Sequence, residues 1–101
     1  MDKHALTVPD TEHERQQLLD ALAADHGPAW AAQYEPGSFG CHELLDRTAL
    51  AADIVERYVR THPACVQHRE WFALAEQAVA ALQELYQRIG AAHLDDKSPR
   101  Y

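Results

Sequence analysis

Residues 38–60 have the sequence SFGCHELLDRTALAADIVERYVR, and this stretch decides the predicted fold. Its apolar side chains recur every three or four positions, which is typical of a helix with one buried face. Ser38 stands where a residue that caps the first turn of a helix is expected. His62-Pro63 ends the pattern, because the residue before a proline disfavours helical backbone. The positions that share the apolar face are Cys41, Leu44, Leu45, Thr48, Ala51, Ala52, Val55, Tyr58 and Val59.

A second long helix is predicted from about His68 onward, because apolar residues again follow helical spacing. These positions span about 160° of the helix circumference, which is wider than the roughly 100° of an ordinary surface helix. The connection of residues 61–67 is short, so we expect the two helices to lie antiparallel. The apolar positions of this helix are Trp71, Phe72, Leu74, Ala75, Ala78, Val79, Leu82, Leu85, Tyr86 and Ile89.

The chain before this hairpin predicts one further helix and a short helical turn. Thr11 and Glu14 have the spacing of a capping box, so a helix is expected to begin at Thr11. Gly27-Pro28 ends that helix, and residues 29–34 are predicted to form a turn that carries Trp30. We expect the helix and the turn to cover the open side of the hairpin.

Together these elements predict an all-α fold, a small three- or four-helix bundle with a central antiparallel helical hairpin. With 101 residues, the chain has room for one domain with a modest core. We place that domain at residues 11–93, after a loose N-terminus of residues 1–10. Residues 94–101 are predicted to form a flexible C-terminal tail, because Gly90 and Pro99 weaken helix formation in this region.

Composition and charge exclude several classes of protein. The formal net charge is −7 and no basic stripe is present, so direct binding to nucleic acid is not expected. No segment approaches the roughly 20 consecutive apolar residues that a membrane span requires. The start of the sequence lacks the basic and apolar segments of a signal peptide. We therefore expect a cytoplasmic protein that does not bind membranes.

The two cysteines, Cys41 and Cys65, are predicted to be free thiols. A helix from residue 41 to residue 60 separates its ends by about 28 Å. The five residues that follow can return at most about 18 Å, which leaves a gap of about 10 Å. A disulfide requires Cα atoms within roughly 7 Å, so the geometry argues against an internal bridge. Free thiols fit a reducing compartment.

Side chains with catalytic or metal-binding chemistry are expected at the open end of the hairpin. Antiparallel packing would bring His93 beside Cys41, with His42 next to it in the sequence. A cysteine and a histidine can form a nucleophilic pair, and all three side chains would supply three of the four ligands of a zinc site. Alternatively, Cys41 packs as a small apolar residue and His93 interacts with the C-terminal end of its helix. We favour this packing interpretation.

A second cluster, His62, Cys65 and His68, has His-x-x-Cys-x-x-His spacing, which resembles part of a zinc site. No fourth ligand lies nearby in the sequence, and a chain with seven histidines is expected to show such spacing by chance. His42 and Asp46 are four residues apart and are predicted to form a solvent-exposed pair. Metal binding is therefore the less favoured interpretation both for this cluster and for Cys41, His42 and His93.

The sequence contains no phosphate-binding glycine loop, nucleophile elbow or paired metal motif. We predict a non-enzymatic, acidic protein-interaction module without a cofactor, which forms a homodimer or docks on a protein partner. Two alternatives remain open: an acidic regulator or inhibitor of a nucleic-acid-binding protein, and a small metal- or thiol-site protein. The contact residues are predicted from apolar positions that lie off the main face of the first hairpin helix or widen that of the second. They are Leu50, Ile54, Phe72, Val79 and Tyr86.

Overall fold

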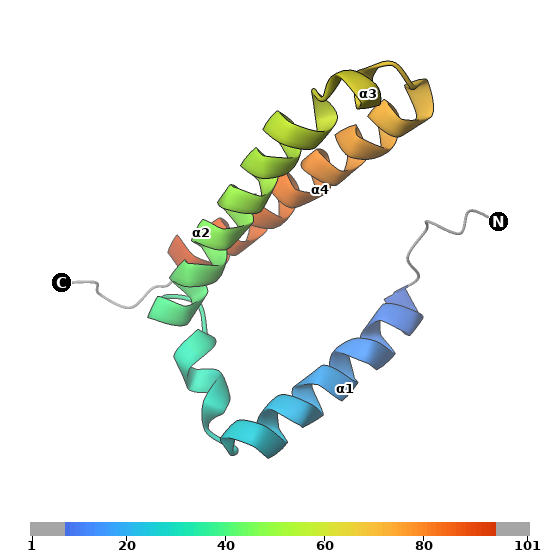
Figure 1. Ribbon diagram of the computed structural model, residues 1–101. Helices are drawn as coiled ribbons and strands as arrows, with labels where there is room; N and C mark the ends of the chain where they lie inside the picture. The colour runs from blue at the N-terminus through green and yellow to red at the C-terminus, as the bar shows by residue number, and fades with distance from the viewer. Residues whose placement is uncertain (1–7, 95–101) are drawn as a thin grey trace. The chain divides into compact units, whose positions relative to one another are not determined.

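The computed structural model describes residues 8–94, and helices that pack against each other form most of this part of the chain (Figure 1). No strand occurs within these residues, so the predicted all-α fold is confirmed. None of the described helices combines the length and the apolarity that crossing a membrane demands. In chain order the elements are α1 (Val8–His26), the 3₁₀ turn η1 (Trp30–Tyr34), α2 (Phe39–Ile54), the π-helical turn η2 (Val55–Arg60), α3 (Pro63–Val66) and α4 (Arg69–Leu94).

The antiparallel hairpin is present as predicted. α2 continues through η2, the chain reverses through α3, and α4 returns alongside α2 (Figure 1). The buried apolar side chains of the hairpin are Cys41 and Leu45 from α2, and Ala75 and Val79 from α4. Three of these four side chains are small, which allows the two helix backbones to approach each other closely.

The buried polar groups of the hairpin have hydrogen-bond partners. Thr48 is buried among the apolar core residues, and its hydroxyl donates to the carbonyl oxygen of Leu44 at 2.8 Å. His93, the other buried polar residue, is described with the candidate site below. Within residues 8–94, no buried side-chain nitrogen or oxygen is without a partner. Desolvation of these groups therefore carries little penalty.

The start of α2 confirms one prediction and adds a contact that the sequence did not reveal. Ser38 has extended backbone, and its Oγ accepts a hydrogen bond from the N–H of Cys41 at 3.1 Å, as expected of a helix cap. Gly40 lies directly against the Tyr34 ring and the carbonyl oxygen of Gln33, where a Cβ atom would collide. The end of η1 therefore packs on the first turn of α2 only because residue 40 has no side chain.

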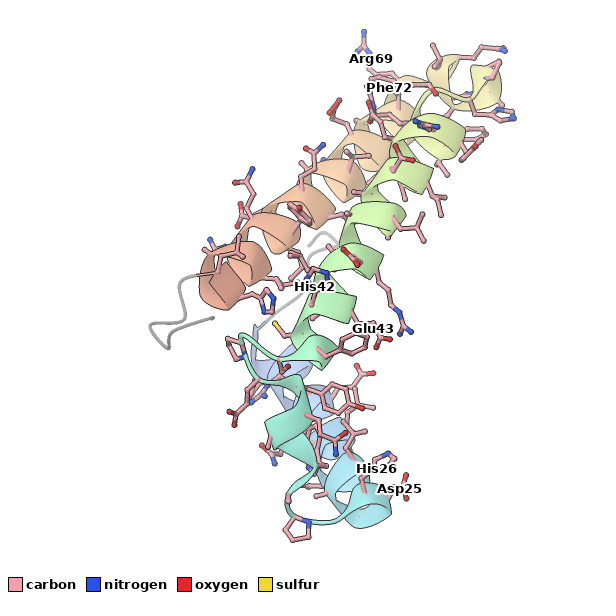
Figure 2. All side chains as sticks on the ribbon, turned by 90° about the vertical axis from the view of Figure 1, so that its left-hand side faces the viewer. Asp25, His26, His42, Glu43, Arg69 and Phe72 are labelled. Atoms are coloured by element: carbon pink, nitrogen blue, oxygen red, sulfur yellow. The ribbon has the colours of Figure 1, made fainter. Side chains whose placement is uncertain are left out.

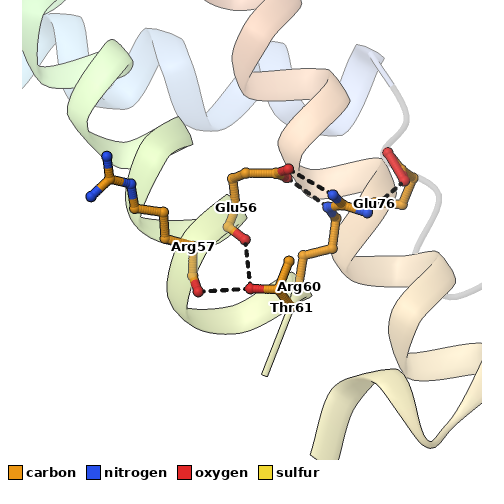
Figure 3. A network of polar contacts seen from close by, with 5 residues as sticks. All are labelled: Glu56, Arg57, Arg60, Thr61 and Glu76. Atoms are coloured by element: carbon orange, nitrogen blue, oxygen red, sulfur yellow. Dashed lines mark hydrogen bonds and ion pairs between the residues drawn. The ribbon is translucent and has the colours of Figure 1, made fainter. Parts of the chain in front are cut away.

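The helix of the first hairpin arm ends at Arg60, as predicted, but its last turn is wider than an α-helix. The hydroxyl of Thr61 donates to the carbonyl oxygens of Arg57 at 2.8 Å and of Glu56 at 3.3 Å, so it caps this π-helical turn (Figure 3). The connection that follows contains the short helix α3. His62 caps the start of this helix, because its Nδ1 accepts a hydrogen bond from the N–H of Ala64 at 3.1 Å.

The chain divides into two units, of which the first ends at Ala32 and the second begins at Gln33. α1 of the first unit begins at Val8 and not at Thr11, so residues 8–10 are helical, contrary to the predicted loose N-terminus. Proline is tolerated in a first helical turn because the N–H groups there have no partner within the helix. The helix ends at His26, and Gly27 follows with a φ of 88°, as predicted.

The apolar side chains of α1 are largely exposed. From Thr11 to His26, only Leu19 is half-buried and every other residue is exposed. The cover of the hairpin by this helix stays a prediction. Leu94, which was predicted to begin the flexible tail, belongs to α4, and the rest of the predicted tail, residues 95–101, lies outside the described residues.

Candidate functional site

The open end of the hairpin brings together the histidines that the sequence placed there. His93 is buried in the last turn of α4, and its Nδ1 accepts a hydrogen bond from the N–H of Gly37 at 2.8 Å. The rings of His93 and His42 are tilted against each other, with 5.6 Å between their centroids. Cys41 is a buried free thiol in the first turn of α2. The antiparallel hairpin thus places His93 at the start of α2, as predicted.

The two histidines at this end of the hairpin each contact a neighbouring group. Nδ1 of His93 is engaged by Gly37, and His42 lies on the exposed side with Asp46, at 3.5 Å between Nε2 and a carboxylate oxygen. Across residues 8–94, no group of three or more histidine, cysteine and acidic side chains is arranged to hold a metal ion. His93 therefore joins the segment before α2 to the end of α4.

The second cluster is divided among different local contacts. His62 caps α3, and the His68 ring stacks on Trp71 with 3.8 Å between centroids. Cys65 is half-buried and free. These three residues lie in the described part of the chain, and they too form no group that is arranged to hold a metal ion. His62 and Cys65 instead line an apolar groove at the closed end of the hairpin.

The predicted contact residues do not form one surface. Val79 is only 3% exposed and belongs to the hairpin core, so its assignment as a contact residue is wrong. Its position was misjudged because the broad apolar arc of α4 includes both the core and the surface on either side of it. Leu50 and Ile54 are exposed, but helical spacing turns them away from the core positions Leu45 and Thr48.

The two remaining predicted contact residues, Phe72 and Tyr86, lie on a polar side of the hairpin. The Phe72 ring is half-buried, and the guanidinium carbon of Arg60 stands 5.2 Å from its centroid. Tyr86 lines a shallow hollow with Ala49, Ala52, Gln83 and Gln87. Figure 2 shows Phe72 near the start of α4, at the opposite end of the hairpin from His42.

Arg60 organises this polar side through charged hydrogen bonds. Its Nε and Nη2 each donate to a carboxylate oxygen of Glu56 at 2.6 Å, and its Nη1 lies 3.4 Å from Glu76 on α4 (Figure 3). The hydrogen bonds from Arg60 lower the pKa of the Glu56 carboxyl, and the same bonds raise the pKa of the Arg60 guanidinium. The guanidinium therefore joins η2 to α4 on this side.

The other side of the hairpin contains an apolar groove of about 530 Å³ at the closed end. Tyr58 is 66% exposed, Trp71 55% and Leu74 45%, although all three are large apolar or aromatic residues. The residues that line the groove are Tyr58, Val59, His62, Ala64, Cys65, Trp71, Leu74 and Ala75. The groove therefore joins the end of the first hairpin arm to the start of α4.

Helical spacing extends this apolar surface along the whole hairpin. One row of residues precedes Tyr58 on α2 and η2, and another follows Trp71 and Leu74 on α4, at steps of three, four or seven residues. The groove places Tyr58, Trp71 and Leu74 together, so the two rows share one face. We call this surface the charge-free face. It consists of Leu44, Ala51, Val55, Tyr58, Trp71, Leu74, Ala78, Leu82, Leu85 and Ile89.

The charge-free face stands out because charged residues make up 25% of the sequence and none of its ten positions. Leu44 at one end is 50% exposed, and Leu85 on α4 is 46% exposed. Sequence reasoning assigned these residues to the core. The signal that could have identified them is the breadth of the α4 arc, which exceeds what one neighbouring helix covers.

No protein-family model, curated protein or solved structure matches this chain.

Proposed function

We propose that this chain is a non-enzymatic helical module that binds a protein through the charge-free face. The observation that carries the proposal is the set of large apolar side chains that remain exposed on that face, with no charged residue among them. Burial of apolar surface contributes roughly 25 cal/mol per Å², so a protein surface that covers this face would gain substantial binding free energy.

The size of the face supports the proposal. From Trp71 to Ile89 the α4 row covers about 27 Å, at about 1.5 Å per residue. Two helices packed about 8–10 Å apart give a width of about 18 Å, hence about 500 Å² in projection. Contiguous apolar patches on soluble monomers are usually no larger than about 300–600 Å² and are often functional.

Charged pairs at the outer edges of the face also fit a protein interface. Arg47 and Glu43 approach to 3.3 Å beside the α2 row, and Arg88 and Glu84 approach to 2.9 Å beside the α4 row. Protein interfaces commonly combine an apolar centre with a polar rim. The two pairs would supply that rim without a net charge.

The proposal is tested by affinity purification of tagged variants from the source cells. Leu85→Lys places a charge on the face, and Leu50→Lys is the matched control because Leu50 is also an exposed leucine but lies off the face. We expect proteins that accompany the wild type to be lost with Leu85→Lys and retained with Leu50→Lys. Circular dichroism verifies that both variants are helical. An identical set of bound proteins for all three chains would refute the proposal.

A further inference from the structure

We infer that the partner of the charge-free face is the same face of a second copy of this chain, so that two hairpins form a four-helix bundle. This inference rests on the proposed function and names the partner for that site.

The distribution of charge is compatible with two copies meeting at this face. Residues 39–94 contain seven acidic and five basic side chains, whereas residues 8–35 contain six acidic side chains and a single arginine. Most of the negative charge thus lies outside the hairpin. The face is uncharged, and the neighbouring pairs Glu43–Arg47 and Glu84–Arg88 are each neutral. At the face itself, two copies would therefore meet without opposing like charges.

The core of a single hairpin is too small for helices of this length. Only Cys41, Leu45, Ala75 and Val79 are buried apolar residues of the described chain, and none of them is fully enclosed. Helical stability in proteins comes mainly from packing of an apolar face, and a helical hairpin requires a second layer to provide it. In a four-helix bundle, each hairpin supplies that layer to the other.

The shape of the face matches another hairpin. The face is two helices wide and runs the length of the hairpin, so an identical face covers it completely. Its projected area of about 500 Å² understates the accessible area, because the side chains stand out from the helices. A standard stable interface buries about 800 Å² of accessible surface on each partner, which is the same order.

The test is the solution mass of the purified full chain over a dilution series, measured by sedimentation equilibrium. We expect twice the chain mass of 11.4 kDa at high concentration and the single-chain mass on dilution. Ala78→Glu replaces an exposed alanine in the middle of the α4 row, and glutamate is a good helix former. This variant should raise the dissociation constant about thirtyfold or more, the range of interface hot spots.

Ala73→Glu is the matched control, because Ala73 is an exposed alanine of the same helix that points away from the face. It should retain the dissociation constant of the wild type. A wild type that stays helical and monomeric at every concentration would overturn the inference, as would equal weakening by both substitutions. If a monomeric wild type still loses a bound protein on Leu85→Lys, the proposed function stands and only the second copy is wrong.

Discussion

His93 and Gly37 are 56 positions apart in the sequence, yet Nδ1 of the buried His93 accepts the N–H of the exposed Gly37 at 2.8 Å. A single side chain near the end of α4 therefore fixes the segment that leads into α2.

Replacement of His93 by phenylalanine should destabilise the hairpin. The variant retains an aromatic ring of similar size but removes the acceptor of the Gly37 N–H. The bond is only part-buried, so its loss should cost about 0.5–1.5 kcal/mol, the net contribution of a typical hydrogen bond. Urea unfolding followed by circular dichroism measures this loss. His42→Phe is the control, since the His42 side chain is exposed and faces the carboxylate of Asp46. Equal stability of the His93→Phe variant and the wild type would contradict the structural role of this bond.

The Arg60–Glu56 contact predicts a pH dependence of stability. Arg60 lowers the pKa of Glu56 from its ordinary value of 4.5, so the folded carboxyl releases its proton more readily than the unfolded one. This difference in pKa stabilises the folded state at pH values above the ordinary pKa of the carboxyl. The stabilisation is lost as the pH falls through the lowered pKa of the folded state. Glu56→Gln should therefore lower the midpoint of thermal unfolding at neutral pH and flatten its dependence on pH in the acid range.

The matched control for this prediction is Glu43→Gln, which removes another carboxylate that lies four residues before an arginine. The Glu43–Arg47 pair is more open, at 3.3 Å, and leaves the contact between Glu56 and Arg60 intact. In this variant, the midpoint of thermal unfolding should depend on pH in the acid range as steeply as it does in the wild type. If Glu56→Gln shows the same slope as Glu43→Gln, the Arg60 contact does not stabilise the fold through ionisation of Glu56.

Alanine at Gly40 should weaken the packing at the start of α2. Its Cβ would collide with the Tyr34 ring and would lie 2.5 Å from the carbonyl oxygen of Gln33, so η1 has to shift. Overpacking of this kind typically costs about 1–3 kcal/mol. The expected loss of stability is measured by chemical unfolding, and an unchanged stability would mean that η1 is not held against α2.

Alanine at Gly90 should have the opposite effect and stabilise the fold. Gly90 lies inside α4, and a Cβ there would stand 3.7 Å from Cδ1 of Leu45, an ordinary contact. Alanine is favoured over glycine in a helix interior by about 0.5–1 kcal/mol. Gly90→Ala should therefore raise the free energy of unfolding, and a decrease would show that the helices are closer at this point than the structure indicates.

The contrast between these two glycines explains how far the sequence could lead. The cap at Ser38 and the stop before Pro63 depend on neighbouring residues, so local patterns predicted them correctly. The contact between Gly40 and Tyr34 depends on how two elements meet, which no local pattern specifies. The extra width of η2 likewise depends on a hydroxyl of Thr61 that bonds carbonyls four and five residues earlier.

The candidate site was harder to predict for a related reason. Helical spacing correctly grouped Trp71 and Leu74 with the apolar arc of α4, but one arc does not say which part meets α2 and which part stays exposed. Val79 was misplaced by this ambiguity. The position of His93 was predicted correctly because antiparallel packing alone brings the end of α4 to the start of α2.

Trp71 offers a local measurement of whether the charge-free face is covered. Its indole is 55% exposed and stacks on His68, so its emission reports on water at the closed end of the hairpin. Trp30→Phe removes the other tryptophan of the sequence, so that the emission comes from Trp71 alone. In this background, we expect Trp71 emission to move to shorter wavelength, and its quenching by acrylamide to fall, as the concentration rises. Burial of an aromatic side chain at an interface removes most of its contact with water.

The Ala78→Glu substitution provides the decisive comparison for this signal. In the Trp30→Phe background, it should hold Trp71 in its exposed state at concentrations where Ala73→Glu allows the shift. A doubled solution mass with unchanged Trp71 emission would show that two copies associate through a different surface. Trp71 lies at one end of the face and Ala78 near its middle. If Ala78→Glu abolishes the concentration-dependent shift of Trp71 emission, the partner that buries Trp71 also covers Ala78. The fluorescence of one residue therefore tests the continuity of the whole face.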